Sequence, residues 1–127
     1  KIFLVRSRSS RKWQIPGGLQ ELDESVQDAM KRELKEELGL EFEVETLIGV
    51  YSSPRWVLEL PNGDIIQQLI FFFKMKGDMA EAQIKLQTDE ISDYCFFDFD
   101  DIPEDTMECC KQKVKDLLNY QGKTFLR

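Results

Sequence analysis

The apolar positions of the chain fall into short runs of strand length and into stripes with helical spacing. The spacing predicts a helix over residues 104–120 and another over residues 24–38, which Asp23 or Ser25 can cap and Gly39 can end. Strands are expected over residues 2–6, 13–18, 42–52 and 94–103, with a hairpin over residues 55–76 that turns at Asn62-Gly63. This order of elements indicates an α/β or α+β fold with a mixed sheet between helices.

The expected helix over residues 24–38 breaks its own apolar pattern. At 100° per residue, Glu33, Glu36 and Glu37 lie on the face that is apolar in the first two turns. Carboxylates three and four residues apart repel one another, and near a helix C-terminus they also oppose the helix dipole. A hard divalent cation such as Mg²⁺ or Mn²⁺ would reverse this effect, because it prefers carboxylate oxygens. The alternative is an ordinary solvated acidic face.

Composition narrows the possible functions. The 127 residues suit one domain, expected over residues 1–127, and the net charge of −7 argues against a nucleic-acid partner. Histidine is absent, which excludes Ser-His and Cys-His catalytic pairs and a Cys/His zinc site. The three cysteines suit a cytoplasmic protein with reduced thiols, and no apolar run approaches the length of a membrane span. The chain opens on Lys1 inside an expected strand, so we expect that an N-terminal strand is missing.

Residues 18–40, "GLQELDESVQDAMKRELKEELGL", resemble the Nudix box, G-x5-E-x7-R-E-U-x-E-E-x-G-U, where U is apolar. All seven fixed positions match, and Leu34 and Leu40 fill the two apolar ones. The preceding "WQIPGG" is also similar to the segment that leads into the box. Asp23 stands where a glycine is common, so we expect a small change in that turn.

The resemblance implies a Nudix-type α/β/α sandwich with a mixed β-sheet between helices. It implies Mg²⁺- or Mn²⁺-dependent hydrolysis of the pyrophosphate bond in a small nucleotide, such as ADP-ribose or an oxidised deoxynucleoside triphosphate. The box would hold the ion through the carboxylates of Glu33, Glu36 and Glu37 and the carbonyl of Gly18. Arg32 is expected to pair with Glu24, bracing the loop and orienting the ligands.

Two further roles are expected. Because histidine is absent, the general base must be a carboxylate, either Glu33 or one from the later acidic segment, where Glu81 and Glu90 are candidates. Glu90 is preferred as an added catalytic ligand or base. Arg6 ends a strand before the box and is expected to bind the substrate phosphates.

Two other functional hypotheses remain beside the pyrophosphohydrolase. One is a nucleotide-sensing module that keeps the Nudix fold without hydrolysis, and the other is an acidic interaction domain. The sequence does not select the substrate, and a homodimer is possible because nothing in the sequence fixes the oligomeric state.

Overall fold

The computed structural model describes residues 1–78, 83–86 and 88–127. Two helices and eight strands follow one another in the order β1 (Ile2–Ser7), β2 (Trp13–Gln14), α1 (Val26–Leu38), β3 (Glu43–Tyr51), β4 (Val57–Glu59), β5 (Ile65–Gln67), β6 (Ile70–Lys76), β7 (Ile91–Phe97), α2 (Glu108–Leu118) and β8 (Phe125–Leu126) within these ranges. Among the described residues, neither helix has the length and apolar character needed to cross a membrane.

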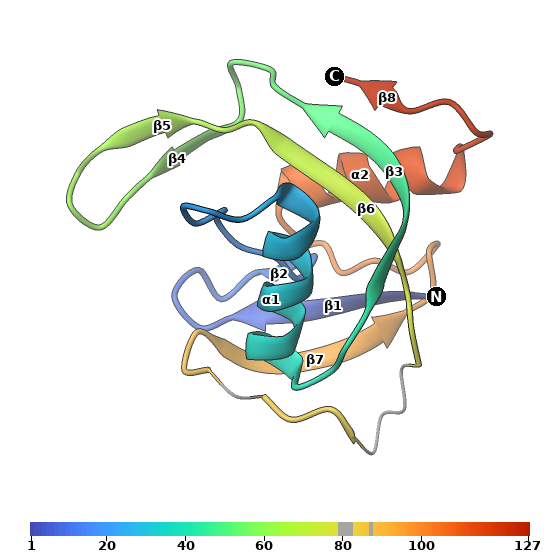
Figure 1. Ribbon diagram of the computed structural model, residues 1–127, viewed down its shortest axis with the longest axis horizontal. Coiled ribbons are helices and arrows are strands. Elements are labelled where there is room, and N and C mark those ends of the chain that lie inside the picture. The colour runs from blue at the N-terminus through green and yellow to red at the C-terminus, as the bar shows by residue number, and fades with distance from the viewer. Residues whose placement is uncertain (79–82, 87) are drawn as a thin grey trace.

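The strands form three hydrogen-bonded groups (Figure 1). In the first, β1 lies between β2 and β7 and is antiparallel to both. In the second, β3 lies between antiparallel β6 and parallel β8, which makes this sheet mixed. The third group is the β4–β5 hairpin, which projects away from the helices in Figure 1.

Strand β1 separates the two helical layers. Val5 is fully buried against Leu34 and Leu38 of α1, whereas its neighbour Leu4 is fully buried in a cluster with Val114 of α2. Successive side chains of a strand point to opposite faces, so the two helices cover opposite faces of β1. Burial of each such leucine or valine stabilises the fold by about 1.5–3 kcal/mol. The predicted α/β/α sandwich with a mixed sheet is confirmed.

Several expected boundaries were wrong. The hairpin expected over residues 55–76 is confined to β4 and β5, because β6 pairs with β3 along its whole length. Helix α2 begins at Glu108 rather than at residue 104, because Thr106 forms a bridge with Trp13 first. Strand β7 begins at Ile91, earlier than expected, and β8 was not expected at all. These differences all arise from pairing with distant parts of the chain.

Candidate functional site

Local contacts fix both ends of α1. The Ser25 hydroxyl oxygen accepts a hydrogen bond from the Asp28 backbone N–H at 3.1 Å, which identifies Ser25 as the N-cap residue. At the other end, Gly39 adopts φ 71° and donates its N–H to the carbonyl of Lys35 at 2.9 Å. Asp23 adopts φ 63°, in the left-handed region that glycine favours, so the turn keeps a conformation that a glycine would also allow. The change expected in this turn stays a prediction.

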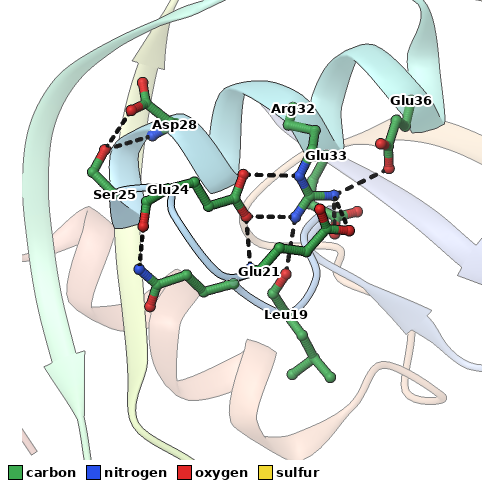
Figure 2. Close-up of polar contacts among 9 residues, drawn as sticks. Leu19, Glu21, Glu24, Ser25, Asp28, Arg32, Glu33 and Glu36 are labelled. Carbon is green, nitrogen blue, oxygen red and sulfur yellow. Dashed lines mark hydrogen bonds and ion pairs between the residues drawn. The ribbon is translucent and has the colours of Figure 1, made fainter.

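A single guanidinium joins the loop before α1 to the glutamates on the helix (Figure 2). Arg32 donates two hydrogen bonds to the Glu24 carboxylate, from Nε at 3.0 Å and from Nη2 at 2.8 Å. It also donates to the Leu19 carbonyl at 3.0 Å, to Glu33 at 3.0 Å and to Glu36 at 3.2 Å. The expected pairing of Arg32 with Glu24 is therefore present, in the bidentate geometry that gives arginine–carboxylate pairs their specificity.

The charges in this network stabilise each other. The Arg32 hydrogen bonds lower the pKa of Glu24, and the backbone N–H of Glu21 lowers it further. The pKa of Arg32 is raised in turn, chiefly by Glu24. Arg32 and Glu24 consequently remain charged as an ion pair at neutral pH, and this pair holds the loop against the helix.

Glu37 lies in a very different environment. Only 4% of its surface is exposed, and its Oε2 has no hydrogen-bond partner among the described atoms. Burial, followed by the nearby charges of Glu33 and Glu90, raises the pKa of Glu37 to about 8. Burial also raises the pKa of Glu33, although the Arg32 guanidinium partly offsets that effect. A buried carboxylate oxygen with no donor is the feature that a bound cation would satisfy.

Gly18 lies directly against Glu33. A Cβ atom at Gly18 would overlap the Glu33 carboxylate, so any other residue would push this side chain away. The absence of a side chain is thus what allows the backbone to approach the glutamate. This close approach is compatible with the expected Gly18 carbonyl ligand.

A second segment of the chain completes the site. A cavity of about 290 Å³ is lined by residues from α1 and from the segment before β7, namely Glu33, Glu36, Glu37, Thr88 and Glu90. The Glu90 carbonyl accepts a hydrogen bond from the Arg8 backbone N–H at 2.8 Å, and its own N–H donates to Thr88 at 2.8 Å. Glu90, expected as a catalytic residue, is therefore brought to the box glutamates. Glu81 lies outside the described residues.

Thr88 was missed by sequence reasoning. Its hydroxyl oxygen shapes the turn that presents Glu90, and the only signal in the sequence is a threonine two residues before that glutamate.

Arg6 is not brought to the glutamates. Its Nη2 donates to Asp105 at 3.1 Å, its Nε donates to the Arg11 carbonyl at 3.0 Å, and its guanidinium lies 5.6 Å from the Trp13 ring centroid. Arg6 alternates with Val5, so it lies on the face of β1 that α2 covers, not the face that α1 covers. Its role in binding phosphate remains a prediction, and this position does not favour it.

The donor set fits a hard divalent cation. All the candidate side-chain ligands are carboxylates, Glu37 offers an unsatisfied oxygen, and Gly18 leaves backbone within reach of Glu33. Within the part of the chain that the structure describes, no three acidic, histidine or cysteine side chains already converge as an ion cage. Figure 2 shows the contacts that hold two of these carboxylates: Arg32 donates to Oε1 of Glu33 and to Oε2 of Glu36.

Comparison with known proteins agrees with this geometry. The sequence-family model of the NUDIX domain matches residues 1–118 of this chain. The chain is 34% identical over 125 residues to an ADP-ribose pyrophosphatase of Methanocaldococcus jannaschii, an alignment covering 96% of this chain and 68% of that relative.

Two solved structures share the fold. An ADP-ribose pyrophosphatase of Streptococcus suis has a TM-score of 0.69 at 22% identity, covering 100% of this chain and 90% of that one. A NUDIX hydrolase of Nitrosomonas europaea has a TM-score of 0.72 at 23% identity, covering 99% and 69%. With a family match over nearly the whole chain and a complete box around a carboxylate-lined cavity, this chain belongs to the Nudix family of pyrophosphohydrolases.

Proposed function

We propose that this chain hydrolyses the pyrophosphate bond of ADP-ribose or a closely related nucleoside diphosphate derivative, with Mg²⁺ or Mn²⁺ held by Glu33, Glu36, Glu37 and the Gly18 carbonyl. The observation that carries this proposal is the buried, unsatisfied oxygen of Glu37 beside the cavity that the other glutamates line. The ADP-ribose pyrophosphatase of M. jannaschii supports the choice of substrate.

The residues of the chain divide the work of hydrolysis. When bound, the ion supplies positive charge that neutralises the diphosphate and lowers the pKa of coordinated water. Arg32, fixed by Glu24 and the Leu19 carbonyl, orients the ligand side chains and is a positioning residue. Glu90 lines the same cavity as the box glutamates from the turn before β7, and its carboxylate accepts the proton of the attacking water.

The activity is tested by incubating the protein with ADP-ribose and Mg²⁺ and measuring the appearance of AMP and ribose 5-phosphate. Glu37→Gln should lose turnover by about two to three orders of magnitude, as expected when one charge-stabilising group is removed from a reaction centre. The matched control is Glu41→Gln, a glutamate with 82% of its side chain exposed that forms an ion pair with Lys35. Equal activity of both variants would contradict the assignment of Glu37.

The substrate and the base are tested separately. A panel with oxidised dGTP and dinucleoside polyphosphates identifies the preferred substrate, and tight binding without turnover of any compound would favour the nucleotide-sensing module instead. For the base, Glu90→Gln should lower kcat without changing the Mg²⁺ concentration that gives half-maximal activity. A shift of that concentration would make Glu90 a metal ligand rather than a base.

A further inference from the structure

Two adjacent cysteines lie in the first turn of helix α2, outside the set of residues that line the carboxylate cavity. The sulfur atoms of Cys109 and Cys110 lie 4.0 Å apart, although neighbouring residues of a helix point in directions about 100° apart. Cys109 is half-buried and Cys110 is only 3% exposed. The third cysteine, Cys95, is exposed on β7 and has no sulfur neighbour among the described residues.

The contacts around the pair lower the pKa of the Cys109 thiol and fix the position of the Cys110 sulfur. Lys113, one helical turn after Cys109 and only 8% exposed, contributes a positive charge, and its Nζ lies 5.9 Å from the Tyr51 ring centroid. The hydrogen bond from Cys110, followed by the Lys113 charge, lowers the pKa of the Cys109 thiol. The Cys110 sulfur accepts a hydrogen bond from the Ile15 backbone N–H at 3.4 Å, which fixes its position against the segment after β2.

The distance between the sulfurs suits chelation of one atom. Two sulfurs bound at about 2.3 Å to one centre stand about 3.3–3.8 Å apart as the angle at the centre opens from about 90°, typical of a pyramidal trivalent centre, to the tetrahedral value. The observed 4.0 Å lies just beyond this range, so a small rotation of the Cys109 side chain is enough to bring both sulfurs onto one centre. A metal ion that needs four protein ligands would remain under-coordinated here, because the other described cysteine is on β7. An organic trivalent arsenical needs two sulfurs only, since its third bond goes to carbon.

We propose that Cys109 and Cys110 form a dithiol site that chelates one thiophilic centre of the trivalent arsenical class. The Cys109 thiolate forms the first As–S bond, and Cys110 forms the second. For a hydrated arylarsine oxide, two As–O bonds break as the two As–S bonds form, and the two thiol protons leave with the oxygens as two water molecules. Arsenic remains trivalent throughout, so no oxidant or reductant is required.

The probe is phenylarsine oxide, added in slight excess to the folded protein, followed by a challenge with excess glutathione and measurement of the intact mass. A single thiol gives an adduct that a competing monothiol removes, whereas a chelate resists it. We expect wild type and Cys95→Ser to retain one phenylarsenic group per chain, and Cys109→Ser to retain none. Cys109 is preferred to Cys110 for this variant because it is less buried, and near-ultraviolet circular dichroism checks that its fold is intact.

Two results would overturn the proposal. The first is a glutathione-resistant adduct on Cys109→Ser equal to that of wild type. The second is the absence of an adduct on folded wild type when the urea-unfolded chain forms one, because the folded geometry would then prevent chelation. Cys110→Ser, if folded, must behave as Cys109→Ser does.

Discussion

The replacement Glu37→Gln should stabilise the protein in the absence of divalent ions, because it removes a carboxylate whose burial is unfavourable. The pKa of Glu37 is raised from 4.5 to about 8, so the folded state keeps a proton that the unfolded state releases. The stability that wild type has with Glu37 protonated is fully present below pH 4.5 and is lost progressively as the pH rises towards 8. At pH 7 the loss is up to about 3 kcal/mol, from 2.5 pH units at about 1.36 kcal/mol each.

Urea unfolding in EDTA at pH 5 and at pH 7 measures this effect. At pH 7 the free energy of unfolding of Glu37→Gln should exceed that of wild type by up to about 3 kcal/mol. At pH 5 the difference should be less than about 1 kcal/mol, because this pH is only half a unit above the unfolded-state pKa and the folded wild type keeps Glu37 protonated. The matched control is Glu36→Gln, whose side chain is 57% exposed, so that the replacement relieves no comparable burial of a carboxylate.

Saturating Mg²⁺ should reverse the order of stability. An ion that binds only the folded state stabilises wild type, whereas the variant lacks one of the ligands and gains less from the ion. The reasoning is refuted if Glu37→Gln unfolds at lower urea than wild type at pH 7 in EDTA. It is also refuted if the gain is the same at both pH values, because a packing effect would then explain it.

Three further changes test other parts of the structure. Gly18→Ala should preserve the fold but displace the Glu33 carboxylate, so the Mg²⁺ concentration for half-maximal hydrolysis should rise at an unchanged urea midpoint. Arg32→Lys cannot form the bidentate pair and should raise that same concentration by about 10- to 100-fold, and an unchanged value would show that the brace does not position the ligands. Tyr51→Phe removes the 2.7 Å hydrogen bond to buried Asp116 and should lower the free energy of unfolding by about 1–3 kcal/mol in urea, with hydrolysis unaffected at low temperature.

The sequence predicted α1 and its glutamates well because the signals are local. Ser25 and Gly39 fix the two ends of the helix through contacts within four residues, and this sets the direction of every side chain between them. The pairing of Arg32 with Glu24 could be expected for the same reason, since the box places both residues on one loop and helix.

Features that depend on distant pairing could not be predicted in this way. The alternation of Val5 and Arg6 shows that they point to opposite faces, but only the packing reveals which helix covers each face. Likewise, β8 has two residues, too few for a pattern, and it forms only because β3 offers an edge for Phe125 and Leu126. The expected length of the hairpin was wrong because the strand that follows β5, β6, pairs with β3 and not with β4.

The two-sided burial of β1 limits how the length of this chain can change. Deleting one residue inside β1 would rotate every later side chain of the strand by half a repeat, so that Arg6 would enter the apolar layer beneath α1 while Val5 would turn towards Asp105. The loop at residues 61–64 is exposed and joins β4 and β5, which form a two-stranded sheet among the residues that the structure describes. Insertions and deletions should therefore be tolerated at the tip of the β4–β5 hairpin but should destabilise the fold in β1. Related chains should accordingly differ in length at the hairpin tip.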